Sequence, residues 1–189
     1  MRIGPFVFVK ELVYKAPDNY IYEEIPSFVK VIDLEENTLN QVKMPKEIYD
    51  YCIFRVKNKY NGIGLVNREN NELMGYAFYS DKTSPPTNIP KLPKGAGWLF
   101  NTLIITKYRG NGYQKLLISE RIKRLRKNQP EIEIYTDIIE ENYPSRKSFL
   151  NSHFIENGVY YVFVVGIRRY RFLNLKIGFW NKKAKHKKI

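Results

Sequence analysis

A glycine-spaced turn separates an apolar segment from an amphipathic one in the middle of the chain. The apolar segment WLFNTLII covers residues 98–105, and the turn RGNG follows at 109–112. A helix start leaves backbone N–H groups without intrahelical partners, and glycine adopts φ angles that other residues avoid. We therefore expect a strand, an open turn and a helix in that order, as in an α/β crossover unit.

The segment after the turn has the pattern of an amphipathic helix over residues 113–126. Its apolar positions fall on one face: Leu117, Ile118, Ile122 and Leu125. The charged positions are expected to face away from it: Lys115, Glu120, Arg121 and Arg124. Such a helix packs its apolar face against a neighbouring layer.

The turn itself has the features of an anion site. The helix start presents the positive end of a dipole, and Gly110 and Gly112 let a phosphate approach the backbone. Arg109 adds a planar cation suited to phosphate oxygens. The spacing matches neither a Walker loop nor a dinucleotide fingerprint. On local pattern alone, a strand-to-helix connection without a ligand is equally compatible.

Other segments complete an α/β pattern with antiparallel ends. Residues 62–80 predict a hairpin with a polar turn at 67–71. A helix is expected over 142–154, because Pro144 suits a first helical turn. Aromatic and β-branched residues predict the remaining strands, at 131–139, 159–167 and 170–180.

Three further segments lie between or beside these elements. Residues 45–58 fit a helix, although CIFRV within them is also typical of a strand. The four prolines of residues 80–97 indicate a long surface loop. The strand at 98–105 has apolar residues on both of its faces, which predicts that other elements pack against both sides.

Length and composition limit the class of protein. At 189 residues we expect one globular domain over 1–180, followed by a basic tail at 181–189. No apolar run approaches the roughly 20 residues of a membrane-spanning helix, so we expect a cytoplasmic protein without a membrane span. The formal charge of +13 favours anionic partners such as nucleic acid or a phosphate-bearing cosubstrate.

Cysteine and histidine usage argues against two classes of enzyme. Cys52 is the single cysteine and lies in an apolar setting, so we expect a buried small hydrophobe rather than a nucleophile. His153 and His186 do not have metal-ligand spacing with each other or with a cysteine. The sequence therefore predicts no metal site and no cysteine hydrolase.

The central segment LIITKYRGNGYQKLL resembles the acyl-CoA-binding motif of the GNAT superfamily of N-acyltransferases. Arg109 and Gly112 match the first and fourth positions of that motif, and Ile104 matches the apolar position ahead of it. Gln114 stands where the family usually has glycine or alanine.

A second stretch strengthens the resemblance. Asn142 and Ser145 match the asparagine and small residue that the family has after its next strand, and Phe154 matches the end of the following short helix. His153 replaces a glycine there. Asn142 follows Arg109 by 33 residues, a usual separation in the family.

The resemblance implies a fold and a cosubstrate. The fold is a mixed, mostly antiparallel sheet of six to seven strands with a splayed central pair, flanked by helices. Acetyl-CoA would lie in the splay and no metal would be needed. Its implied contacts are the strand residues Leu103, Ile104 and Ile105, the turn residues Arg109, Gly110, Asn111, Gly112, Tyr113 and Gln114, and the flanking residues Asn142 and Ser145.

The resemblance also implies an activity: transfer of an acetyl group from acetyl-CoA to a primary amine by direct attack. The tyrosine that usually protonates the thiolate is replaced by Phe149, so Tyr143, Tyr160 and Tyr161 are candidates instead. Many relatives have a glutamate on the central strand where this chain offers only Asn101, which could orient a water. The nearest acidic candidates for the base are Asp137, Glu140 and Glu141.

Two alternatives stay open. One is an acyl-CoA-binding module that has lost turnover, which Phe149 and the missing glutamate permit. The other is an acyltransferase associated with nucleic acid or the ribosome, because basic and aromatic residues alternate near the end of the chain: Arg168, Arg169, Tyr170, Arg171, Phe172 and Lys176. The amine acceptor is unknown, and a second copy of the chain is a further partner to consider.

Overall fold

The computed structural model describes residues 2–3, 6–81, 84, 92–167 and 170–180. Most of the expected loop at 80–97 lies outside these residues, as do Arg168, Arg169 and the basic tail. The chain forms two compact units. The first contains Met1–Pro17, Asn88–Lys94 and Tyr135–Ile189, and the second contains Asp18–Thr87 and Gly95–Ile134.

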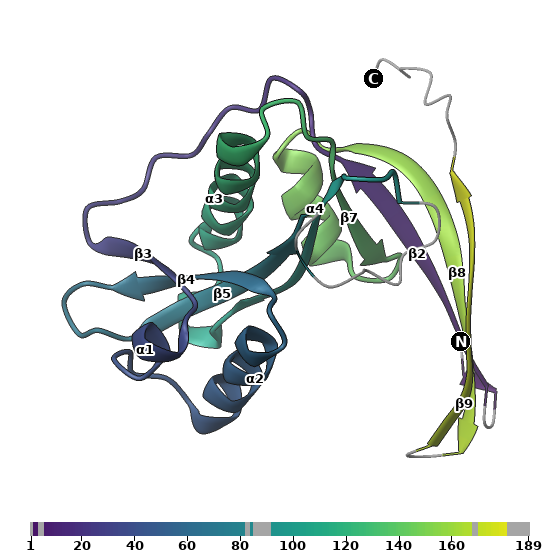
Figure 1. Cartoon of the computed structure of the whole chain (residues 1–189), viewed down its shortest axis with the longest axis horizontal. Coiled ribbons are helices and arrows are strands. Elements are labelled where there is room, and N and C mark those ends of the chain that lie inside the picture. The colour runs from purple at the N-terminus through teal and green to yellow at the C-terminus, as the bar shows by residue number, and fades with distance from the viewer. Residues whose placement is uncertain (1, 4–5, 82–83, 85–91, 168–169, 181–189) are drawn as a thin grey trace. The chain divides into compact units, whose positions relative to one another are not determined.

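The second unit is built on four antiparallel strands. They are β3 (Val29–Asp33), β4 (Asn61–Asn67), β5 (Leu73–Ser80) and β6 (Gly97–Ile104), paired in that order (Figure 1). The expected hairpin is confirmed as β4 and β5, with its turn between Asn67 and Leu73. The short strand β3 was not expected separately, and it pairs with β4.

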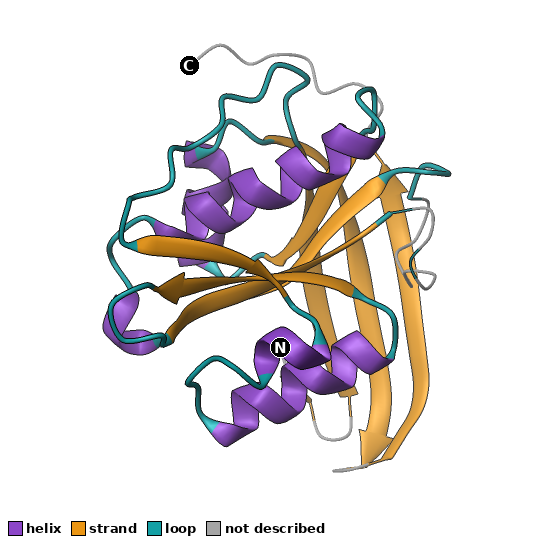
Figure 2. Ribbon diagram, turned by 60° about the vertical axis from the view of Figure 1, so that its left-hand side comes forward, coloured by secondary structure: helices purple, strands orange, loops and turns teal. Residues whose placement is uncertain are grey.

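Helices cover both faces of these four strands (Figure 2). On one face are α1 (Glu36–Leu39) and α2 (Lys46–Lys57), whose buried residues pack on Leu73 and Phe78. On the other is α3 (Tyr113–Asn128), whose Leu116 and Leu117 pack on Met74 and Ala77. The segment that fitted either a helix or a strand is therefore helical.

Cys52 is fully buried in α2, as expected from the sequence. Burial raises the pKa of its thiol to about 12. A thiol of this kind stays protonated at neutral pH and is a poor nucleophile.

Arg121 corrects one expectation about α3: it is fully buried rather than facing solvent. Its position four residues from both Leu117 and Leu125 places it in the middle of the apolar face. Its Nε donates to the carbonyl of Leu117 at 3.0 Å, and Nη1 donates to the carbonyl of Phe78 at 2.9 Å and to that of Phe100 at 3.3 Å. Burial lowers the pKa of this guanidinium.

Glu120 is a second exception to the expected solvent-facing side of α3, because it is only 6% exposed. Its carboxylate accepts a hydrogen bond from Nη1 of Arg124 at 2.6 Å, one turn further along the helix. A buried carboxylate is tolerated when a cation pairs with it in this way.

The strand β6 is covered on both sides only in its first half. Trp98 and Leu99 are buried, whereas Asn101 is exposed. The register with β5 shifts here, since Phe78 is opposite Phe100 and Tyr76 is opposite Leu103. Asn101 has a φ of 47°, so this irregularity is a bulge that turns its side chain out of the ladder.

The first unit contains the remaining strands. They are β1 (Arg2–Ile3), β2 (Phe6–Lys15), β7 (Ile134–Ile139), β8 (Ile155–Ile167) and β9 (Tyr170–Trp180). The antiparallel order is β7, β2, β8, β9, and β1 pairs with β2. The strands expected at 131–139 and 159–167 are confirmed with shifted starts, and the strand expected at 170–180 has the expected bounds.

The helix α4 (Tyr143–Asn151) joins β7 to β8 and is the expected helix with Pro144 in its first turn. It contacts β2 through Arg146, whose Nε donates to the hydroxyl of Tyr14 at 3.3 Å. The α/β class with mostly antiparallel strands and flanking helices is thus confirmed. The short strands β1 and β3 bring the number of described strands to nine, above the expected six to seven.

Among the described residues, none of the helices has the length and apolar character that crossing a bilayer requires.

Candidate functional site

The glycine-spaced turn of the second unit has an open backbone. After β6 a short 3₁₀ helix, Thr106–Tyr108, leads into it. Gly110 has a φ of 85° and Gly112 a φ of 78°, so both adopt the left-handed conformation that glycine favours. No heavy atom lies within 4 Å of where a Cβ would stand at either residue. The outer side of the turn is therefore accessible to a ligand.

The backbone N–H groups of residues 110–113 donate to no acceptor in the described part of the chain. Gly112 is the N-cap of α3 and provides no side chain to cap it. The side chain of Asn111 instead donates inward, to the carbonyls of Tyr108 at 3.3 Å and Arg109 at 3.1 Å. Uncapped N–H groups at the start of a helix of 16 residues are able to donate hydrogen bonds to an anion.

Arg109 lies at the edge of the turn with an exposed side chain. Its Nε donates to the carbonyl of Ile104 at 3.0 Å, which holds the start of the guanidinium against the end of β6. In the described part of the chain, its two terminal nitrogens have no hydrogen-bond partner. The guanidinium can therefore donate to a phosphate oxygen without losing this anchor.

The remaining residues implied for the cosubstrate on this unit lie on both sides of the turn. Leu103 is opposite Tyr76 in the ladder, and Ile105 donates its N–H to the carbonyl of Met74 at 2.9 Å. Tyr113 and Gln114 form the first turn of α3 and are partly buried.

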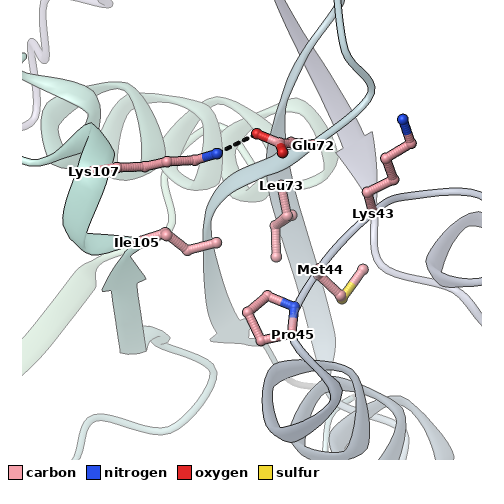
Figure 3. Close-up of a pocket in the computed structure, with 7 residues that line it drawn as sticks. All are labelled: Lys43, Met44, Pro45, Glu72, Leu73, Ile105 and Lys107. Carbon is pink, nitrogen blue, oxygen red and sulfur yellow. Dashed lines mark hydrogen bonds and ion pairs between the residues drawn. The ribbon is translucent and has the colours of Figure 1, made fainter.

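A pocket of about 340 Å³ lies beside the segment that leads from β6 into the glycine turn (Figure 3). Its lining comes from the α1–α2 connection, the start of β5 and the residues that follow β6: Lys43, Met44, Pro45, Glu72, Leu73, Ile105 and Lys107. Glu72 accepts hydrogen bonds from Lys107 and, at 2.9 Å, from the hydroxyl of Tyr108. These two donors lower the pKa of Glu72 and fix the 3₁₀ helix ahead of the turn.

The second stretch implied by the resemblance lies in the first unit. Asn142 is the N-cap of α4, and its side-chain oxygen accepts from the backbone N–H of Ser145 at 3.3 Å. Tyr143 is 67% exposed and Glu141 is also exposed. The guanidinium of Arg146 lies 5.6 Å from the Tyr143 ring centroid.

Phe149 is a buried packing residue. It is 3% exposed, and its ring packs edge-on against Phe154 with 4.9 Å between centroids. Phenylalanine has no proton to donate, so this position takes no part in acid–base chemistry.

A cluster of three titratable side chains lies on the sheet of the first unit. The hydroxyl of Tyr160 contacts a carboxylate oxygen of Glu11 and one of Asp137. Burial, and then the neighbouring carboxyl of Glu11, raise the pKa of Asp137 from 3.8 to about 8. Burial and the two acids also raise the pKa of Tyr160. The sequence had identified Asp137 and Tyr160 only as separate candidates.

Glu11 is the member of this cluster that sequence reasoning missed. The sequence could have pointed to Glu11, because this acidic residue alternates with the apolar residues Val9 and Val13 along a strand. Side chains at such positions share one face of the sheet, where an unpaired carboxylate is costly. Its partners could not be found locally, because Tyr160 is 149 residues away.

The free energy of unfolding of wild type is expected to fall between pH 5 and pH 8. Replacing Asp137 with asparagine is expected to make this fall smaller. Because the folded pKa is raised to about 8, folded Asp137 keeps a proton that the unfolded chain has already lost. Its contribution is complete at low pH and declines as pH rises towards 8. Urea unfolding across this range measures the effect, and Asp18→Asn, at an exposed position, is the control. If the free energy of unfolding depended on pH equally in wild type and Asp137→Asn, the raised pKa of Asp137 would be contradicted.

Comparison with known proteins gives structural matches only: no family model and no curated protein matches the sequence. A tandem GNAT protein from the clavulanic acid biosynthesis pathway superposes with a TM-score of 0.60 and 14% identity, covering 82% of this chain and 52% of that one. A GCN5-related N-acetyltransferase from Sphaerobacter thermophilus gives a TM-score of 0.57 and 12% identity, covering 85% and 52%.

The aminoglycoside acetyltransferase AAC(6')-Iy, in complex with a bisubstrate analogue of CoA, gives a TM-score of 0.50 and 16% identity, covering 69% of this chain and 92% of that one. The chain thus spans about half the length of the tandem GNAT and Sphaerobacter structures and most of the length of AAC(6')-Iy.

Proposed function

We propose that this chain, which has the GNAT fold, is an N-acyltransferase that transfers an acetyl group from acetyl-CoA to a primary amine. The observation that carries the proposal is the open turn at Gly110–Tyr113, with its uncapped N–H groups at the start of α3. A diphosphate is complementary to such a turn, because it carries negative charge and has oxygens that accept hydrogen bonds from the N–H groups.

The cosubstrate contacts follow from the residues around this turn. The diphosphate would accept hydrogen bonds from the backbone of Gly110, Asn111, Gly112 and Tyr113 and from the free nitrogens of Arg109. The pantetheine arm would follow the segment Leu103, Ile104 and Ile105 at the end of β6, and Gln114 would lie beside the diphosphate. Asn142 and Ser145, on the first unit, stay proposed contacts that rest on the resemblance alone. AAC(6')-Iy, a structural neighbour of the same fold, is described in complex with CoA.

The reaction would be direct attack of the amine nitrogen on the thioester carbonyl. The bulge at Asn101 directs this side chain out of the β5–β6 ladder, where it could orient a water or the acyl group. Glu141 and Tyr143 are exposed residues beside the cap of α4 and are proposed as further groups that contact substrate. Positioning of the two substrates would then supply most of the rate.

The test is a calorimetric titration with acetyl-CoA, followed by a screen of amines that detects release of free CoA thiol. Saturable binding at one site and thiol release that depends on one class of amine are expected. A well-folded protein that does not bind acetyl-CoA would contradict the proposal.

A second function has one observation in its favour. The buried Phe149 replaces the tyrosine that would protonate the leaving thiolate, which suits a protein that binds acyl-CoA without turnover. Saturable binding without thiol release from any amine in the screen would support this binding module instead.

A further inference from the structure

The pocket that Lys43 and Lys107 line is a preformed cavity within the second unit. All seven lining residues belong to this unit, and the volume of about 340 Å³ is typical of small-molecule sites, which occupy roughly 300–1,000 Å³. Backbone hydrogen bonds fix its shape: the N–H of Lys43 donates to the carbonyl of Asn71, and the N–H of Leu73 donates to the carbonyl of Lys43, both at 2.9 Å. The α1–α2 connection is therefore held against the start of β5 before any ligand binds.

One side of the pocket is apolar and the other is charged. Figure 3 shows the side chains of Met44, Pro45, Leu73 and Ile105 below those of the charged residues. Leu73 is buried, whereas Met44 and Ile105 are partly exposed, so their carbon surface is accessible from the pocket. The thioether of a methionine makes favourable contacts with aromatic rings. The apolar side therefore suits a flat ring system.

The charged side carries one positive charge that the pocket itself does not balance. Lys107 pairs with Glu72, which also accepts a hydrogen bond from the hydroxyl of Tyr108 at 2.9 Å. These hydrogen bonds lower the pKa of Glu72, and the charge of Lys43 acts in the same direction. Lys43 is exposed and forms no ion pair with the side chains that the structure describes. Two ammonium groups thus lie near a single carboxylate, which favours an anionic ligand.

Tyr108 connects the pocket to the turn proposed for the diphosphate. Its hydroxyl donates to Glu72, and its ring is edge-on to that of Tyr113, the first residue of α3, with 6.5 Å between centroids. Lys107 precedes Gly110 by three residues, so their Cα atoms are at most about 11 Å apart. In acetyl-CoA a single ribose carries the diphosphate, the adenine ring and the 3′-phosphate. A diphosphate bound at the turn would therefore bring a flat ring and a second anion close to the pocket.

We propose that this pocket binds the 3′-phosphoadenosine end of acetyl-CoA. The adenine ring lies on the apolar side, and the 3′-phosphate accepts hydrogen bonds from the ammonium groups of Lys43 and Lys107. An ammonium group has three hydrogens, so Lys107 can bind a phosphate oxygen and keep its contact with Glu72. The inference rests on the proposed function and adds to it a site that distinguishes acetyl-CoA from a carrier without the 3′-phosphate.

The experiment titrates wild type and Lys43→Ala by calorimetry with acetyl-CoA and with acetyl-dephospho-CoA, which lacks only the 3′-phosphate. Wild type is expected to bind acetyl-CoA more tightly. Lys43→Ala is expected to reduce this preference about 10-fold, the effect of losing one hydrogen bond to a charged group, while its affinity for acetyl-dephospho-CoA stays at the wild-type value. The fold is expected to stay intact, because the printed hydrogen bonds of Lys43 come from its backbone.

Lys57→Ala is the matched control. Lys57 is an exposed lysine of the same unit, with a side chain 63% accessible, at the end of α2 away from the pocket. This variant is expected to keep the wild-type preference for acetyl-CoA. An equal preference in wild type and Lys43→Ala would overturn the pocket assignment and leave the proposed function standing, since acetyl-CoA still binds.

Adenosine 3′,5′-bisphosphate is the second probe, because it contains the proposed pocket ligand without the pantetheine arm. It is expected to compete with acetyl-CoA for wild type and to bind Lys43→Ala more weakly. If this nucleotide bound in a manner that depends on Lys43 and acetyl-CoA did not bind, the pocket would belong to a free nucleotide and the proposed function would be contradicted. Absence of binding by either compound would overturn both.

Discussion

Replacing Arg121 with alanine is expected to lower the free energy of unfolding by about 4 kcal/mol, because it combines a large cavity with the loss of buried hydrogen bonds. The guanidinium is fully buried in the core between α3 and the strands of the second unit. It donates to the carbonyls of Phe78 and Phe100, which are opposite each other beside the bulge at Asn101. Its loss removes the guanidinium donor from both backbone oxygens.

Urea unfolding followed by circular dichroism measures this change. Lys123→Ala is the matched control, since Lys123 is an exposed residue of the same helix with a side chain 62% accessible. The control is expected to stay within about 0.5 kcal/mol of wild type. A loss below about 1 kcal/mol for Arg121→Ala, at an unchanged dependence on urea, would show that the buried guanidinium does not stabilise the bulge.

Replacing Arg109 with glutamate is expected to weaken acetyl-CoA binding about 100-fold, because it exchanges charge-assisted hydrogen bonds for repulsion of the diphosphate. The side chain is exposed and its one described hydrogen bond goes to the carbonyl of Ile104, so the fold is expected to stay intact. Calorimetric titration with acetyl-CoA gives the affinity.

Lys127→Glu supplies the control for net charge, because it makes the same change of charge in the last turn of α3, away from the glycine turn. It is expected to bind acetyl-CoA nearly as wild type does at moderate salt, where distant surface charges are screened. Equal weakening in both variants would mean that overall charge, rather than a contact at Arg109, attracts the cosubstrate.

Local patterns predicted most of the elements around the candidate site. The apolar strand, the glycine turn and α3 follow each other within about 30 residues, so their periodicity could be read without tertiary information. The positive φ angles of Gly110 and Gly112 and the packing role of Cys52 were also accessible in this way.

Features that depend on distant segments were not predictable. Arg121 was assigned to the solvent face because it is charged, although its spacing from Leu117 places it on the apolar face. Its carbonyl partners lie on β5 and β6 and could not be known from the helix alone. The register of β2 with β7 and β8, which unites Glu11 with Asp137 and Tyr160, is likewise a property of the folded sheet.

The central claim is that the backbone amides from Gly110 to Tyr113 bind the diphosphate of acyl-CoA. The most direct measurement is the change in amide ¹H and ¹⁵N chemical shifts of labelled protein during a titration with acetyl-CoA. Gly95 is an internal reference, because it also has a positive φ of 83° and open space around it but does not precede a helix. We predict saturable shifts at Gly110 and Gly112 and none at Gly95. Saturable binding that leaves the Gly110 and Gly112 amides unchanged would contradict the claim.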